Sequence, residues 1–198
     1  MNEGLDIEFV RETYQKMSDK ELIRVLTQDA VGLTDEAIEV VKKEIKKRNL
    51  DPNIVKGLDA QQKIYSDYEI DLYCNILQKL QCPITGNTHE KLNATLAIEV
   101  RSFWEISEVR KIIVIGCSEA LDQANDKAIK KTLLYGWWSA HGFINTIKAI
   151  RTNIKNKKNN HQYEPTEVLR DFVRSKIGLI ETYKNDDQML FKIISGNY

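Results

Sequence analysis

The sequence predicts a mostly helical α+β fold built around one small antiparallel β-hairpin. Apolar residues recur at helical spacing through the first 60 residues and again after Ala120. Residues 92–103 instead carry apolar residues in rough alternation, and residues 109–115 form a denser β-branched run, as strands do. The chain has only 3 prolines and 9 glycines, which favours helices over a loop-rich fold. We therefore expect an N-terminal helical module, the hairpin, and a helical C-terminal half.

The composition is that of an ordinary globular protein and points to no charged partner. Hydrophobic residues are 42% and charged residues 29%, which argues against global disorder. The 29 Lys and Arg balance the 29 Asp and Glu, so we expect no nucleic-acid partner. Only 3 cysteines occur, and residues 1–6 lack the basic and apolar regions of a secretory signal. A reducing cytoplasm is the expected compartment.

Residues 1–59 are expected to form the helical module. Apolar residues between Leu5 and Tyr14 predict a first helix that ends near Met17. The sequence from Ser18 to Glu21 is a capping box that starts a second helix, and Thr34 precedes a third.

Residues 60–198 are expected to hold the hairpin and the remaining helices, in one domain or continuous with the first. The pattern predicts a helix over 60–81, strands over 92–103 and 109–115 joined near 102–108, and helices from Ala120 onward. The polar stretch 148–158 is a candidate linker, and helices follow from Glu164 and over 187–194.

Two turns that resemble Cys-x-x-Cys knuckles, each with only one of the two cysteines, flank the predicted hairpin; we call them the knuckle remnants. One is Cys82-Pro83-Ile84-Thr85-Gly86 and the other is Gly116-Cys117-Ser118-Glu119-Ala120. A zinc ribbon needs two Cys-x-x-Cys knuckles, because four ligands converge on one ion. Thr85 and Ala120 stand where the second cysteines would be. We expect a metal-free scaffold without a cofactor.

Two alternatives remain for the surviving thiols. Cys82 and Cys117 could recruit His89, and Glu119 as well, into a mixed zinc site. They could also form a disulfide, although a reducing compartment opposes it.

A resemblance follows from these remnants and from the Leu-Leu-Tyr-Gly-Trp-Trp sequence at 133–138, which is followed by Thr-Ile-Lys-Ala-Ile-Arg-Thr-Asn at 146–153. Residues 82–153 resemble uncharacterised bacterial zinc-ribbon proteins in which two Cys-x-x-Cys knuckles precede a Gly-Trp-Trp segment. Residues 14–50 separately resemble a small helical module of Bacteroidetes proteins. Neither resemblance implies a known activity, and the first implies a ribbon fold.

No recognisable catalytic motif accompanies these features. His89, His141 and His161 are isolated in sequence, and neither a Gly-rich phosphate loop nor a Gly-x-Ser-x-Gly motif occurs. We therefore expect that the protein is not an enzyme.

The tryptophan segment is the strongest candidate for function. Residues 132–147 carry no Lys, Arg, Asp or Glu, and we favour a buried helix there. The stretch is shorter than the roughly 20 residues that span a bilayer. With the basic residues that follow, segment 132–158 would instead suit an interfacial helix. An exposed protein-binding face is the third option. The contact residues would be Trp137, Trp138, Lys148, Arg151 and Lys155.

The function that these observations favour is non-enzymatic binding of a partner protein in the cytoplasm. One concrete form is an immunity or antitoxin-like protein that covers a toxin. The alternatives are a peripheral membrane protein that uses segment 132–158 and a zinc-binding ribbon protein.

Overall fold

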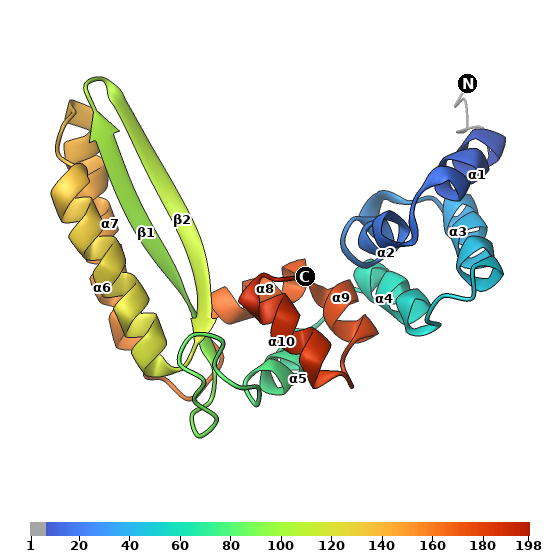
Figure 1. The fold of residues 1–198 in the computed structure, drawn as a ribbon. Coiled ribbons are helices and arrows are strands. Elements are labelled where there is room, and N and C mark those ends of the chain that lie inside the picture. The colour runs from blue at the N-terminus through green and yellow to red at the C-terminus, as the bar shows by residue number, and fades with distance from the viewer. Residues whose placement is uncertain (1–6) are drawn as a thin grey trace. The chain divides into compact units, whose positions relative to one another are not determined.

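The computed structural model describes residues 7–198, so Leu5, expected in the first helix, lies outside the described part. Over residues 7–198, ten α-helices and one 3-10 turn accompany a two-stranded antiparallel sheet (Figure 1). This architecture confirms the mostly helical α+β class.

By its internal contacts the chain divides into two compact units, which are described separately. The helical unit contains the described residues up to Ser66 and the later segment Val173–Asp187, and the sheet unit contains Asp67–Phe172 and Gln188–Tyr198. The boundary expected after residue 59 falls inside a helix, and no sequence signal indicated that residues 173–187 belong with the N-terminal helices.

The helices of the helical unit are α1 (Ile7–Lys16), α2 (Asp19–Gln28), the 3-10 turn η1 (Ala30–Gly32), α3 (Asp35–Lys47), α4 (Asn53–Gln62) and α9 (Ile177–Thr182). The predicted capping box is present: the Ser18 hydroxyl accepts the Glu21 N–H, and the Glu21 carboxylate accepts the Ser18 N–H at 2.9 Å. Thr34 likewise accepts the Ala37 N–H at the start of α3. Because these caps satisfy amides that lack partners within the helix, local sequence sets both helix starts.

Apolar side chains from α1 to α4 form the core of the helical unit. Its buried members are Tyr14, Leu22, Leu26, Ala30, Ile38, Val41, Ile45, Ile54 and Leu58. Helix α9 packs closely on α4, because a Cβ on Gly57 would lie only 2.4 Å from the Gly178 carbonyl oxygen. Only glycine leaves room for this approach, which anchors the returning segment.

The sheet unit is formed by α5 (Asp67–Leu77), β1 (Asn93–Phe103), β2 (Ile106–Gly116), α6 (Ser118–Tyr135), α7 (Ala140–Asn159), the first part of α8 (Glu167–Ser175), and α10 (Asp187–Ser195), which starts at the division. The strands pair from Asn93 with Gly116 to Phe103 with Ile106. The predicted strands are therefore present and longer than expected. The predicted helix over 60–81 is shorter, since α5 covers only its middle.

The stretch 148–158 is not a linker, and that expectation is wrong. It lies within α7, which runs alongside β1 (Figure 1). The side chains of Asn153 and Asn156 donate to backbone carbonyls of β1. Polar composition suggested a solvated segment, whereas these amides form hydrogen bonds with backbone groups of the sheet. The segment is therefore part of the packed structure.

The edge of β1 opposite β2 is covered by α6 and α7. Asn153 accepts the Ile98 N–H at 3.0 Å and donates to the Ile98 C=O at 2.8 Å. Thr132 accepts the Val100 N–H at 3.0 Å. Asn153 and Thr132 are both buried. Buried backbone groups need partners, so helix side chains complete this strand edge in place of a third strand. We call it the covered edge.

Candidate functional site

The hairpin ends in a turn of only two residues, Trp104 and Glu105, because Phe103 pairs with Ile106. Trp104 has φ = 57°, a left-handed conformation in which Gly, Asn or Asp is the usual residue. Turn chemistry therefore does not explain a tryptophan here. Nor does core packing, since 80% of the Trp104 side chain is exposed, as is 80% of Phe103. Sequence reasoning missed this turn because it expected a longer connection.

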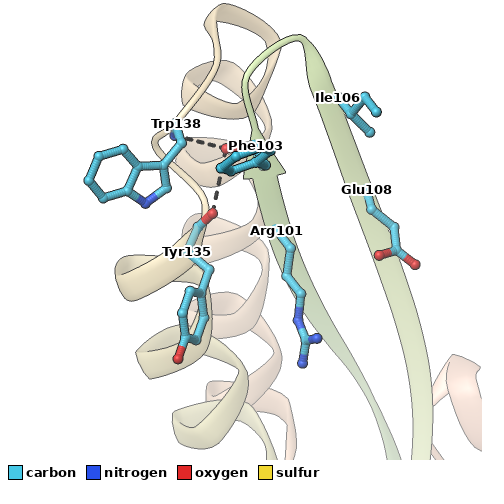
Figure 2. A pocket seen from close by; sticks show the side chains of 7 residues that line it. Arg101, Phe103, Ile106, Glu108, Tyr135 and Trp138 are labelled. Carbon is cyan, nitrogen blue, oxygen red and sulfur yellow. Dashed lines mark hydrogen bonds between the residues drawn. The ribbon is translucent and has the colours of Figure 1, made fainter.

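The connection between α6 and α7 lies against the same end of the hairpin, where Ser102 of β1 holds it. The Ser102 hydroxyl donates to the Gly136 carbonyl at 2.8 Å. It also accepts the Trp138 N–H at 2.8 Å and lies 3.5 Å from the Tyr135 carbonyl oxygen (Figure 2). A Cβ on Gly142 would lie 2.4 Å from Ser102 Oγ, so α7 starts in direct contact with the strand. Ser139 caps α7 by accepting the Gly142 N–H at 2.9 Å. These contacts fix the backbone from which Trp138 projects.

A pocket of about 630 Å³ opens between the hairpin end and this connection. Its lining residues are Arg101, Ser102, Phe103, Ile106, Glu108, Tyr135 and Trp138 (Figure 2). Most of Ile106 and Trp138 is exposed, at 74% and 68%. We call the group Phe103, Trp104, Ile106, Tyr135 and Trp138 the hairpin-end surface.

The hairpin-end surface carries charge of both signs at its border. Arg101 and Glu108 line the pocket from facing positions of the two strands. Arg110 Nε lies 2.7 Å from Glu108 Oε1, and this hydrogen bond lowers the pKa of Glu108. Glu108 therefore stays ionised at neutral pH, so the pocket offers a fixed negative group beside its apolar wall.

The uncharged stretch 132–147 is not the buried helix that the sequence favoured. Helix α6 ends within it and α7 begins within it, and Trp137 and Trp138 lie in the connection between them. Their side chains are exposed, whereas the polar Thr132 and Thr146 are buried. The apolar character of this stretch therefore belongs to its outer surface, and the expectation of burial is wrong.

The predicted contact residues do not form one compact surface. Lys148, Arg151 and Lys155 are all exposed, and their spacing places them on one face of α7. At 1.5 Å per residue they lie roughly 12 to 22 Å along the helix from its start at Ala140. The cations are thus set back from the aromatic end. Of the five predicted residues, Trp138 belongs to the hairpin-end surface.

The two knuckle remnants face each other. Gly86, with φ = 74°, closes the first turn by donating to the Cys82 carbonyl at 2.9 Å. The Cys117 N–H, at the start of α6, lies 3.3 Å from Cys82 Sγ, and Thr85 Oγ1 lies 3.3 Å from Cys117 Sγ. Ala120 Cβ and Cys82 Sγ both adjoin Gly116. All four knuckle positions therefore converge, with two thiols among them.

Cys82 is buried but surrounded by donors. Burial raises the pKa of its thiol. Hydrogen bonds from the Thr85 side chain and from the backbone of Cys117, Thr85 and Ile84 outweigh this effect and lower the pKa to about 7. This donor set stabilises a thiolate, as metal knuckles do. Within residues 7–198, however, no group of three or more His, Cys, Asp or Glu side chains could hold a metal ion, and all three cysteines are free thiols.

The histidines lie elsewhere. His89 is exposed and lines a pocket with His161, Ser118 and Tyr163, while Cys82 and Cys117 do not contribute to that pocket. His161 Nε2 lies 3.0 Å from Asp122 Oδ2 at an exposed position. The mixed site of Cys82, Cys117 and His89 is therefore not assembled in this structure.

In comparisons with known proteins, no family model, curated protein or solved structure matches this chain. The resemblances drawn from the sequence stay predictions. Among residues 7–198, none of the helices combines the length and apolar character needed to traverse a bilayer.

Proposed function

We propose that this chain binds another protein through the hairpin-end surface and catalyses no reaction. The observation that carries the proposal is the exposure of Phe103, Trp104 and Trp138 around a pocket bordered by Arg101 and Glu108. Aromatic residues and arginine are enriched where proteins bind one another, and they supply most hot spots. A cluster of exposed aromatic residues at one end of the unit is the pattern that such an interface requires.

The rigidity of the surface supports the same proposal. Both hydrogen bonds of Ser102 and the close packing of Gly142 hold the backbone on either side of Trp138. A surface that is already ordered loses little conformational entropy when it binds. The backbone that carries Trp138 is therefore held in place before a partner arrives.

A protein partner fits this surface better than a lipid bilayer does. An interfacial element on anionic lipid places cations beside its aromatic residues. Here Glu105 and Glu108 lie at the hairpin end, and the cationic residues Lys148, Arg151 and Lys155 are set back along α7. Because Arg101 and Arg110 also lie at this border, its charge is mixed. It gives anionic headgroups no net attraction and suits a partner protein that carries charges of both signs.

A specific form of this function is an immunity or antitoxin-like role, in which the chain covers the working surface of a toxin. What supports it is the combination of a rigid aromatic surface with an ionised Glu108, which would pair with a basic toxin surface. The three free cysteines support a reducing, cytoplasmic setting.

The test is affinity purification of the tagged chain from its native cells, followed by titration calorimetry with the purified partner. The double variant Trp104→Ala, Trp138→Ala removes two exposed rings, and we expect it to lose the partner. At about 2 kcal/mol or more for each hot-spot ring, affinity should fall roughly a thousandfold. Tyr163→Ala is the matched control, because Tyr163 is an aromatic residue of the same unit that is 79% exposed and lies outside the hairpin-end surface.

Two outcomes would contradict the proposal. In one, the double variant retains the same partner with the affinity of the wild type. In the other, no partner is recovered and the wild-type chain floats with phosphatidylserine vesicles, while the double variant does not. That result would assign the surface to membrane binding instead.

A further inference from the structure

The backbone groups of one outer edge of the hairpin have hydrogen-bond partners, and those of the other outer edge do not. On the covered edge, backbone groups of Ile98 and Val100 form hydrogen bonds with buried side chains of α6 and α7. In an antiparallel pair, hydrogen-bonded and non-hydrogen-bonded residue pairs alternate. Since Ile98 and Val100 direct their backbone groups away from β2, their partners Lys111 and Val109 must direct theirs away from β1.

The same alternation places the outward backbone groups of β2 on Ser107, Val109 and Lys111. Within the described residues, their N–H and C=O groups form no hydrogen bond. The side chains along this edge are also open: 43% of Val109 and 48% of Ile113 are exposed. We call this the free edge. A long strand edge with unpaired backbone groups is a template for another strand.

We propose that the free edge pairs antiparallel with the free edge of a second copy of this chain, centred on Val109, to form a continuous four-stranded sheet. In this arrangement Val109 faces the second copy's Val109 across a two-fold axis. Ile106 then faces Ile112, and Ser107 faces Lys111. Each outward N–H and C=O of these three central residues gains a partner. This proposal goes beyond the protein-binding function: it concerns the backbone edge of β2, which adjoins the hairpin-end surface and shares Ile106 and Glu108 with that surface and its pocket.

Charge complementarity selects the second copy as the occupant. With Val109 on the axis, Glu108 of each chain faces Arg110 of the other, so two attractive cross-strand pairs form. Because outward groups must meet outward groups, the pairing can shift only in steps that keep Ser107, Val109 and Lys111 facing the other strand. The neighbouring registers place Glu108 against Glu108, or Arg110 against Arg110, on the axis. The strand sequence is therefore complementary to itself in the Val109-centred register.

Reversing one charge at a time tests this register. Glu108→Arg leaves two positive charges at positions 108 and 110, and Arg110→Glu leaves two negative charges. Each variant alone makes both cross-strand pairs repulsive. The dissociation constant of its dimer should therefore be at least about tenfold higher than that of the wild type. An equimolar mixture of the two variants restores opposite charges at every cross-strand position and should dimerise again.

The mixture separates the contact between chains from the contact within one chain. In both variants the Glu108–Arg110 ion pair within the strand, 2.7 Å in the native chain, is replaced by like charges. Only pairing between two chains can therefore recover the association. Sedimentation velocity over a concentration series reads the mass, 22.9 kDa for the monomer and twice that for the dimer.

A disulfide scan tests the geometry directly. Facing residues of a hydrogen-bonded antiparallel pair have Cα atoms about 5.5 Å apart, within the range of a disulfide. Val109→Cys should therefore cross-link as a dimer under mild oxidation. Lys111→Cys is the matched control: its thiol faces Ser107 of the second copy, and the two new thiols are too far apart to bond.

The proposal is overturned if the wild-type chain is a monomer over the whole concentration series. It is also overturned if the variant mixture fails to dimerise, or if Lys111→Cys cross-links as readily as Val109→Cys. These results measure self-association, whereas the proposed function is tested by partner binding of variants at Trp104 and Trp138. Failure here therefore leaves the proposed function to its own test.

Discussion

Replacing Asn153 tests how the covered edge of β1 is held. Asn153 is fully buried, accepts the Ile98 N–H at 3.0 Å, donates to the Ile98 C=O at 2.8 Å, and accepts from Asn125 Nδ2 at 3.1 Å. Asn153→Leu keeps the number and branching of the side-chain heavy atoms, and leucine has the higher helix propensity, so the change does not weaken α7 itself. It removes all three hydrogen bonds.

The size of the loss in stability depends on which buried polar groups lose their hydrogen-bond partners. The Ile98 N–H loses its acceptor, whereas the Ile98 C=O keeps Thr132 Oγ1 at 3.4 Å and Asn125 Nδ2 keeps the Leu96 C=O at 3.5 Å. A buried polar group left unpaired costs about 1–3 kcal/mol, and each weakened bond costs part of that. We expect Asn153→Leu to lower the free energy of unfolding by about 2–4 kcal/mol, a large share of typical domain stability.

Urea unfolding followed by tryptophan fluorescence measures this loss in the relevant unit. All three tryptophans, Trp104, Trp137 and Trp138, lie in the sheet unit, so their emission reports its unfolding. Asn159→Leu is the matched control, because Asn159 is exposed at the end of α7 and its side chain has no hydrogen-bond partner within residues 7–198. A loss below about 1 kcal/mol for Asn153→Leu, or one equal to the control, would refute the role given to this amide.

Three further outcomes follow from other contacts. The pKa of Cys82 is about 7 in the folded protein against 9.0 for an ordinary thiol, so the unfolded state binds more protons between these values. Under reducing conditions stability should rise by about 2 kcal/mol from pH 7 to 9, and Cys82→Ser should abolish the rise in urea titrations. Gly142→Ala places a Cβ 2.4 Å from Ser102 Oγ and should lower the free energy of unfolding by about 1–3 kcal/mol, despite the better helix propensity of alanine. An unchanged midpoint of urea unfolding would show that α7 starts farther from β1. Asp71→Asn breaks the bidentate ion pair with Arg170, whose Nε and Nη2 lie 2.6 and 3.1 Å from the carboxylate oxygens. It should lower the free energy of unfolding by about 1–3 kcal/mol at low salt. Equal stability of variant and wild type in thermal melts would contradict this role of the ion pair.

The elements with a strong local signal were predictable from the sequence. The Ser18 capping box and the strand pattern after Leu92 are local signals, and the structure contains both the cap and the strand, although the polar Thr95 and Glu99 of that strand are buried. The return of residues 173–187 to the helical unit was not predictable, because it depends on the close approach of Gly57 and Gly178, which are far apart in the sequence.

The candidate site was predictable only in part. Trp138 stood out as an aromatic residue in an uncharged stretch, but apolar composition was taken to mean burial. Trp104 gave no turn signal, because tryptophan is unusual in a two-residue hairpin turn. Asn153 was assigned to a linker, since the sequence does not show whether an amide faces water or a strand edge. In each case, long-range packing set the environment of the side chain.

The central claim is that helix side chains close one edge of the hairpin and leave the other open for association. Amide hydrogen exchange measured by NMR tests it most directly, by comparing Ile98 and Val100 on the covered edge with Val109 and Lys111 on the free edge. We predict slow exchange at Ile98 and Val100 at every concentration, with fast exchange at Val109 and Lys111 that slows as the protein is concentrated. Equal protection of both edges in dilute protein, or rapid exchange at Ile98 and Val100, would contradict the account.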